Sequence, residues 1–309
     1  MSRKLDLIAM ATVVVAAISL LLYYANRSID LTTGCIGEQQ PPASGENATK
    51  GLSVLQVWEM PDELTEISAN VLVDSTHMAC VQDNDGVIYI YNLKSKSVDK
   101  KISFGGNGDY EGLSLVGTIF YVLRSDGFLY EVATGNAQKP IVKTYDLPLE
   151  IENYTEPMFY DHEHNRLLIG TKDKDLTEND RKGVYAFDLT TKKMNTHAVF
   201  MIGGQSISQE NSDDKKSRRN GKKRKKRAKD DIMPSEIAIH PQTGSLYVLS
   251  GPKSELLIAD RSGQIQSTIQ LDKKIFPQPE GMCFTPSGGL YISSEGGKKG
   301  RGVIAKVQL

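Results

Sequence analysis

Short apolar runs alternate with turn residues along the chain from about residue 53 onwards. Runs such as VIYIYNL (87–93) and LYVLS (246–250) are rich in β-branched and aromatic residues, and Gly, Asn, Asp and Ser separate them. Runs of this length between such residues are typical of antiparallel strands joined by tight turns. The pattern therefore predicts an all-β domain with very little helix.

The predicted strands recur in five similar units, whose starts lie 46, 45, 79 and 45 residues apart. The units open with TEISANVLVD, EGLSLVGTIF, EPMFYDHEHN, SEIAIHPQTG and EGMCFTPSGG, at Thr65, Glu111, Glu156, Ser235 and Glu280. Each unit holds three short strands, and a fourth follows in most of them. Four antiparallel strands every ~45 residues are typical of a propeller blade, which buries both faces of its sheet only against neighbouring blades. The sequence predicts a five-bladed β-propeller over residues 51–309.

The last unit is one strand short. It ends with RGVIAKVQL, where the chain stops, whereas the segment SVLQVWEMP (53–61) precedes the first unit and belongs to none. We expect this segment to supply the outer strand of blade five and so to close the ring.

A different pattern occupies the N-terminal region. Residues 7–24 read LIAMATVVVAAISLLLYY, and only Thr12 and Ser19 among them are polar. As a helix the run is ~27 Å long, close to the ~30 Å of a hydrocarbon core. Arg3 and Lys4 precede it, which favours a cytoplasmic N-terminus. The sequence predicts a cytoplasmic tip and transmembrane anchor over 1–25, a flexible linker over 26–50 rich in Gln, Pro, Ser and Gly, and a propeller in the periplasm or cell exterior, held at the inner (plasma) membrane.

Two alternatives to the anchor stay open. A cleaved signal peptide would need small residues just after the apolar run, where the chain reads YYANRS. A lipoprotein would use the segment LTTGC (31–35), although its Cys lies eleven residues beyond the apolar run. All three interpretations export the domain.

Several blade segments carry a family resemblance. YEGLS (110–114), PQPEGMCFTPSGGLYISSE (277–295), ACVQDNDGVIYIYNL (79–93) and GSLYVLSG (244–251) are similar to the SdiA-regulated family of exported bacterial β-propellers, which includes calcium-regulated propeller proteins. The resemblance covers residues 54–309 and implies an N-terminal membrane segment, but neither a specific ligand nor DNA contact. Glu66, where a Gly is usual, departs from the family pattern, as does a long basic insert.

That insert accounts for the near balance of positive and negative charges over the whole chain. The chain has 37 Lys+Arg, 38 Asp+Glu and 39% hydrophobic residues, which excludes a wholly disordered or collagen-like protein. Eleven basic residues lie in the insert, predicted over 205–232, and the remaining 26 basic residues face 38 acidic ones, a balance of −12. The insert is either a solvated loop or a site for an anionic surface or other polyanion. Its basic residues are Lys215, Lys216, Arg218, Arg219, Lys222, Lys223, Arg224, Lys225, Lys226, Arg227 and Lys229.

Acidic residues recur at one position of the repeat. Glu111, Glu156 and Glu280 enter the innermost strands of their blades, and Thr65 and Ser235 occupy the corresponding places, followed by Glu66 and Glu236. Two carboxylates ~6 Å apart repel by about 2.8 kcal/mol at an effective dielectric near 20, so a cation, a Lys or Arg, or a raised pKa must relieve such a ring. Two interpretations follow. Either the oxygens bind calcium, or each Glu accepts backbone N–H groups of the next blade and braces the ring.

Other motifs add little chemistry. QDNDG (82–86) and DHEH (161–164) fit hairpin turns better than metal loops, three Cys are too few for a disulfide framework, and no nucleophile elbow or HExxH motif is present. The sequence thus favours a membrane-anchored binding or scaffold module, with calcium as its one candidate cofactor. The alternative is a calcium-dependent propeller hydrolase of phosphate esters or lactones.

Overall fold

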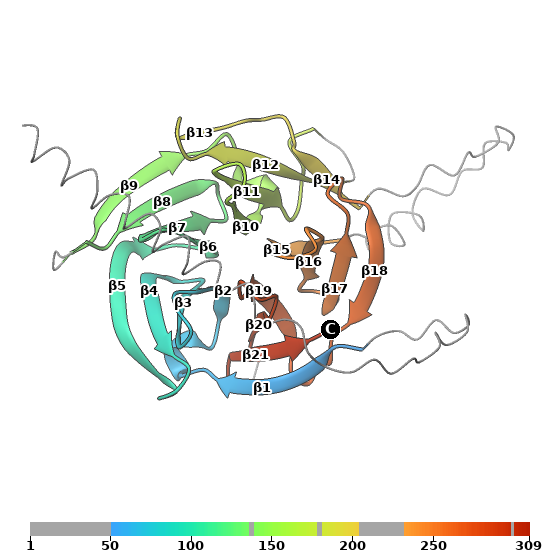
Figure 1. The fold of residues 1–309 in the computed structure, drawn as a ribbon. Coiled ribbons are helices and arrows are strands. Elements are labelled where there is room, and N and C mark those ends of the chain that lie inside the picture. Colours follow the sequence, from blue (N-terminus) through green and yellow to red (C-terminus); the bar gives the residue numbers. More distant parts are fainter. Residues whose placement is uncertain (1–50, 136–138, 178–180, 204–231, 298–299) are drawn as a thin grey trace, which may run out of the picture. The chain divides into compact units, whose positions relative to one another are not determined.

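The computed structural model describes residues 51–135, 139–177, 181–203, 232–297 and 300–309. In these ranges the chain forms five antiparallel sheets that follow one another around a common axis (Figure 1). The predicted five-bladed propeller is therefore confirmed. No helix in the described ranges is long and apolar enough to span a bilayer. The predicted anchor, the linker up to residue 50 and the eleven basic residues of the insert lie outside these ranges.

The first two blades are regular four-stranded meanders. Blade one consists of β2 (Ile67–Leu72), β3 (His77–Gln82), β4 (Asp85–Asn92) and β5 (Ser97–Asn107). Blade two consists of β6 (Tyr110–Val116), β7 (Ile119–Arg124), β8 (Phe128–Ala133) and β9 (Ile141–Asp146).

Blades three and four repeat the arrangement, with one irregularity. Blade three consists of β10 (Thr155–Asp161), β11 (Arg166–Thr171), β12 (Lys182–Asp188), β13 (Lys193–Met194) and β14 (Phe200–Ile202). Blade four consists of β15 (Pro234–Ile239), β16 (Leu246–Ser250), β17 (Glu255–Ala259) and β18 (Ile265–Gln270). Both β13 and β14 pair with β12, so the outer strand of blade three is divided. The Asn195 side chain accepts the backbone N–H of His197 between the two pieces, a local turn that interrupts the ladder.

Blade five closes the ring with strands from both ends of the described chain. It contains β19 (Gln278–Phe284), β20 (Leu290–Glu295) and β21 (Val303–Gln308), and β1 (Ser53–Glu59) pairs antiparallel with β21 at its outer edge. The expectation for residues 53–61 is therefore confirmed. The helices of the described ranges are two short 3-10 turns, η1 (Asp62–Leu64) and η2 (Ile151–Asn153).

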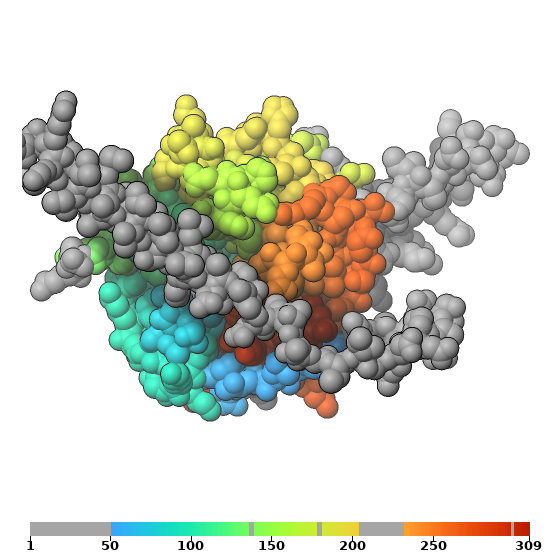
Figure 2. All heavy atoms as spheres, in the orientation of Figure 1, coloured from blue at the N-terminus to red at the C-terminus, as the bar shows by residue number. Residues whose placement is uncertain are grey.

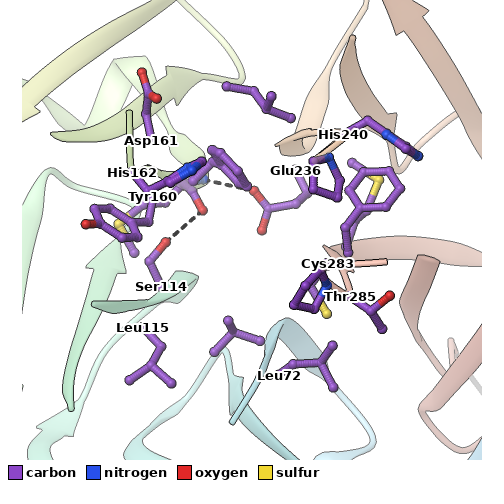
Figure 3. A pocket seen from close by; sticks show the side chains of 18 of the residues that line it. Leu72, Ser114, Leu115, Tyr160, Asp161, His162, Glu236, His240, Cys283 and Thr285 are labelled. Carbon is purple, nitrogen blue, oxygen red and sulfur yellow. Dashed lines mark hydrogen bonds between the residues drawn. The ribbon is translucent and has the colours of Figure 1, made fainter. Parts of the chain in front are cut away.

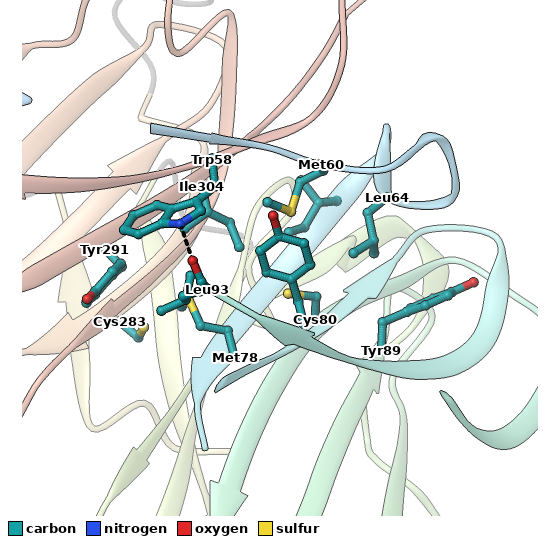
Figure 4. Close-up of a cluster of buried hydrophobic side chains, with 12 residues drawn as sticks. Trp58, Met60, Leu64, Met78, Cys80, Tyr89, Leu93, Cys283, Tyr291 and Ile304 are labelled. Atoms are coloured by element: carbon teal, nitrogen blue, oxygen red, sulfur yellow. Dashed lines mark hydrogen bonds between the residues drawn. The ribbon is translucent and has the colours of Figure 1, made fainter. Parts of the chain in front are cut away.

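The core is divided into five clusters, and each cluster fills the space between two neighbouring blades. Between blades five and one, for example, Trp58 and Tyr291 belong to the same cluster as Met78 and Cys80 (Figure 4). Both faces of every blade are thus covered, which explains why the strands alternate so weakly between apolar and polar residues. In space-filling view the visible atoms of successive blades meet around the ring (Figure 2).

Candidate functional site

A β-bulge at the start of every innermost strand positions the recurring acidic residues. The register shifts between Ile67 and Ala69, and again at the matching place of each other blade. A bulge leaves one residue unpaired and redirects its side chain. The residues at the bulges are Ser68, Glu111, Glu156, Ser235 and Glu280.

This register corrects the alignment of blade one. Ser68, and not Thr65, occupies the place of Glu111, so Glu66 lies outside the inner strand. Glu66 is exposed and accepts a hydrogen bond from Asn84 Nδ2 at 3.2 Å. Ser68 lies 43 residues before Glu111 and Thr65 lies 46 before it, so both fit a repeat of about 45 residues and the spacing could not distinguish them.

Lys172 lies among the three bulged glutamates. It directly follows β11, it is largely buried, and its Nζ donates to Glu156 Oε1. Glu111, Glu156 and Glu280 are 8%, 1% and 4% exposed, and all three act electrostatically on the ammonium of Lys172. The Tyr154 hydroxyl approaches Glu111 Oε1 at 3.4 Å. We call Glu111, Glu156, Glu280 and Lys172 the acidic centre.

Burial dominates the proton affinities in the acidic centre. Burial, followed by the charges of Asp109 and Glu280, raises the pKa of Glu111 to about 8. Burial and the charge of Glu111 raise the pKa of Glu156 well above its usual value, while Lys172 opposes the shift. Burial also lowers the pKa of Lys172, but the carboxyl groups of Glu280 and Glu156 outweigh it and the net pKa is raised. At neutral pH the centre therefore holds the charged ammonium of Lys172, and Glu111 largely retains its proton.

An outer tier of acidic residues surrounds the centre. Burial, with the charges of Glu280 and Asp83, raises the pKa of Glu295 to about 7. Burial, with the charges of Glu66 and Asp109, raises the pKa of Asp83 to about 6. Glu66 thus belongs to the rim of this acidic region rather than to its buried part.

These residues are a poor fit for calcium. An ammonium already occupies the position that would compensate the carboxylates, and Ca²⁺ prefers six to eight ionised or neutral oxygens without a competing cation. Among the described residues, the one group that brings three ligand atoms within 4.8 Å of each other is Asp161, Glu163 and His164 in the hairpin turn after β10. There, Asp161 Oδ2 lies 2.9 Å from His164 Nδ1 and accepts from Arg166 Nε at 2.9 Å, so polar contacts within the turn already engage this carboxylate.

Glu236 lies elsewhere in the ring and partly fits the bracing interpretation. It is 2% exposed, and its Oε1 accepts the backbone N–H of Met158 in the preceding blade at 3.0 Å and that of Ile237 at 2.9 Å. It sits one residue beyond the bulge, where the other blades carry Ala69, Gly112, Pro157 and Gly281. Burial raises its pKa well above the usual value.

Glu236 also lines a cavity of about 680 Å³ (Figure 3). The bulged glutamates lie at the N-terminal ends of the inner strands, whereas the cavity is formed by the C-terminal halves of these strands and the turns that follow. We call this cavity the axial pocket. Its wall is mostly apolar and includes Leu72, Leu113, Leu115, Ile239, Met282 and Phe284.

Sequence reasoning missed the axial pocket because its residues share no chemical type. Asn70, Ser114, His162, His240 and Cys283 contribute to its lining, one from each of the five blades. The sequence offered one signal, Glu236, which follows the bulge of blade four. The repeat alignment had grouped it with Glu111, Glu156 and Glu280, whereas it lines the pocket instead.

The family model of the SdiA-regulated proteins matches residues 56–297, which is most of the chain. The chain belongs to the SdiA-regulated family. The resemblance seen in the blade openings is thereby confirmed. Among curated proteins, no relative matches this SdiA-regulated propeller in sequence.

Solved structures are similar to this chain at low sequence identity. The glutaminyl cyclase of Myxococcus xanthus is 13% identical, with a TM-score of 0.53 over 83% of this chain and 95% of that one. The β-propeller domain of Cps50 (Swd1) from Myceliophteria thermophila is 15% identical, with a TM-score of 0.40 over 74% and 66%. At such identities the likeness concerns the fold alone.

Proposed function

We propose that this SdiA-regulated propeller is a binding module that takes a small organic molecule in the axial pocket. The observation that carries the proposal is the pocket itself, whose 680 Å³ fall within the ~300–1,000 Å³ of ligand sites. A mostly apolar wall with a few placed polar groups is also typical of such sites. The acidic centre needs no ligand to compensate its charge, since Lys172 already pairs with Glu156 there. This supports the axial pocket, rather than the acidic centre, as the ligand site.

A ligand screen tests this function. The purified full-length chain is expected to show a thermal shift with members of a metabolite library, and Leu115→Trp is expected to abolish it by filling the pocket. Ile141→Trp is the matched control, because Ile141 lies on outer strand β9 and is 67% exposed. Shifts that persist in Leu115→Trp, or a library without hits, would contradict the proposal.

The export of the module belongs to the same proposal. The apolar run at 7–24 and the charges before it support a single-pass anchor with the propeller outside the cytoplasm. Protease added to intact cells, with the outer membrane opened where one exists, is expected to remove the propeller. Protection of the propeller under these conditions would contradict export.

The proposal does not require calcium, because Lys172 serves as the compensating cation of the acidic centre. Titration of the full-length chain with calcium chloride to millimolar concentrations is expected to leave its melting temperature unchanged. A stabilising shift that Glu111→Gln abolishes would instead support the calcium interpretation, and with it the hydrolase alternative.

One observation favours a second function. Glu111 and Glu295, with pKa values of about 8 and 7, could exchange protons near neutral pH, as general acids and bases do. The fold likeness to a glutaminyl cyclase suggests the assay, which is ammonia release from a peptide that begins with Gln. Release that Glu111→Gln abolishes and Leu115→Trp leaves intact would establish an enzyme at the acidic centre. No release by the wild-type chain would exclude this activity.

A further inference from the structure

We infer that the axial pocket binds an organic ammonium, with the charged nitrogen at Glu236 and an apolar body along the wall. This inference rests on the proposed function and narrows it to one chemical class. It is carried by the geometry of Glu236, by the excess of buried acidic groups and by the pairing of the other polar groups around the pocket.

Glu236 has one oxygen engaged and one available. Its Oε1 accepts the backbone N–H groups of Met158 and Ile237, which fixes the carboxyl group in place. In the described part of the chain, no hydrogen bond is made to its Oε2. Figure 3 shows the side chain extending from blade four toward the middle of the pocket. A rigid carboxyl oxygen at the floor of an apolar cavity is a specific recognition element.

The buried charges around the axis favour a cation. Four carboxyl groups near the axis are buried, those of Glu111, Glu156, Glu280 and Glu236, and the ammonium of Lys172 interacts with the first three. That ammonium is held by Glu156, and the charge of Glu280 also acts on Glu236. Carboxylates among these groups would repel an anionic ligand, whereas an organic ammonium would pair with one of them.

The other deep polar groups of the pocket are already paired. Asn70 donates to Cys283 Sγ at 3.3 Å and accepts from Ser293 Oγ at 2.7 Å. The Ser114 hydroxyl donates to the Met158 carbonyl at 3.2 Å. Because these groups satisfy one another, Glu236 Oε2 is the deep polar atom left to select a ligand.

We expect ligand binding to be accompanied by release of a proton, because Glu236 lies among other titratable groups. The charge of Glu280 reaches it from blade five, and Cys283 interacts with it from the same blade. The rim carries Asp161, Glu163, His162, His240 and Arg261, of which Asp161 pairs with Arg166 and Arg261 with Glu163. Since burial favours the neutral acid, an incoming ammonium pairs with a carboxylate and the carboxyl proton leaves to the buffer.

Three probes of equal length test the inference, namely n-hexylammonium, n-hexanol and hexanoate, measured with the full-length chain by isothermal titration calorimetry at pH 7. We expect n-hexylammonium to bind at least about tenfold more tightly than n-hexanol, and hexanoate not to bind. Measurement in two buffers of different ionisation enthalpy is expected to show up to one proton released per hexylammonium.

Glu236→Gln is the decisive variant, because a Gln oxygen can still accept the Met158 and Ile237 N–H groups. It is expected to weaken hexylammonium binding at least about tenfold and to abolish proton release. Glu59→Gln, an exposed carboxylate on outer strand β1 outside the pocket lining, is the matched control and is expected to change affinity less than about twofold.

The outcomes separate the inference from the proposed function. If hexanol binds as tightly as hexylammonium and Leu115→Trp abolishes both, the pocket is a ligand site and the ammonium assignment is wrong. Equal affinity of Glu236→Gln and wild type would also overturn the assignment. If nothing binds in the pocket, including the metabolite library, both fail. Should Glu236→Gln not fold, the three-probe comparison on the wild-type chain decides.

Discussion

Lys172 is the residue on which the electrostatics of the ring depend. A buried ammonium and buried carboxyl groups are each costly alone, and the cost falls only when they pair. Lys172 pairs with Glu156 and feels Glu280 and Glu111, while Glu156 Oε2 and Glu280 Oε2 have no hydrogen-bond partner within the described residues. The centre is thus partly compensated and partly protonated.

Removing the ammonium should destabilise the fold. We expect Lys172→Met to lower the free energy of unfolding by about 3 kcal/mol at pH 8, because the carboxyl groups lose their counter-ion. The loss should be smaller at pH 5, where they are protonated. Urea unfolding checks both values, and Glu156→Gln combined with Lys172→Met should recover part of the loss. Lys101→Met is the control, because Lys101 pairs with Glu63 at the surface and its removal should cost less than about 1 kcal/mol. Equal effects of the two Lys variants would contradict this role.

The proton affinity of Glu111 predicts how stability changes with pH. Its pKa in the folded protein, about 8, exceeds the ordinary value of 4.5, so the folded state binds this proton more tightly than the unfolded chain. The associated stability is fully present below pH 4.5 and is lost as the pH rises to about 8. One such proton changes the free energy of unfolding by up to about 1.4 kcal/mol per pH unit.

Glu111→Gln should therefore flatten the decline in stability between pH 5 and pH 8. Urea unfolding of both proteins at four pH values checks this, and the difference between them isolates Glu111 from other titrating groups such as His77, whose pKa is also raised by its hydrogen bond to Asp74. Parallel curves for the two proteins would refute the assignment.

At the scale of elements, two features convert five similar sheets into one closed body. The bulges at the starts of β2, β6, β10, β15 and β19 turn polar side chains toward the axis. Strand β1 then joins the N-terminal and C-terminal parts of the described chain in blade five. Trp58 secures this joint, since it packs against Tyr291 at 6.0 Å between ring centroids and its Nε1 donates to the Leu93 carbonyl in blade one at 2.8 Å.

Trp58 offers a direct test of ring closure, because its indole packs on Tyr291 in blade five and donates to the Leu93 carbonyl in blade one. We expect Trp58→Ala to lower the free energy of unfolding by about 3–5 kcal/mol, since the buried indole fills space between two blades. Trp58→Phe should cost less, because it keeps an aromatic ring and loses the hydrogen bond, worth about 1 kcal/mol. Urea unfolding followed by circular dichroism measures both. A Trp58→Ala variant as stable as the wild type would show that closure does not depend on this joint.

At the scale of the whole molecule, charge is distributed unevenly along the chain. Outside the eleven basic residues of the insert the balance is −12, and much of that acidity gathers around the axis. An ammonium ligand for the pocket and a polyanion for the insert would then be complementary to two different parts of the same protein.

The insert's role can be measured with lipid vesicles. If it binds anionic surfaces, the full-length chain, held in detergent-free nanodiscs of neutral lipid, should bind vesicles containing phosphatidylglycerol, and binding should weaken as salt is raised. Deletion of residues 211–230 should remove most of this affinity, since each Lys or Arg near the surface contributes about 1 kcal/mol. A deletion variant that binds equally well would leave the insert as a solvated loop.

The sequence by itself determined the blade number, the strand pattern and the closure by residues 53–61, because a repeat of short strands leaves few other ways to bury its faces. It also determined that Glu111, Glu156 and Glu280 share one place in the repeat. Only the tertiary structure decided that Lys172 lies among them, that Ser68 takes the place assigned to Thr65, and that Glu236 opens into a pocket at the other end of the inner strands. The reason is physical. Periodicity records which face of a strand is buried, whereas a bulge shifts the register by one residue and a cavity gathers side chains from distant blades, and neither leaves a repeating mark in the chain.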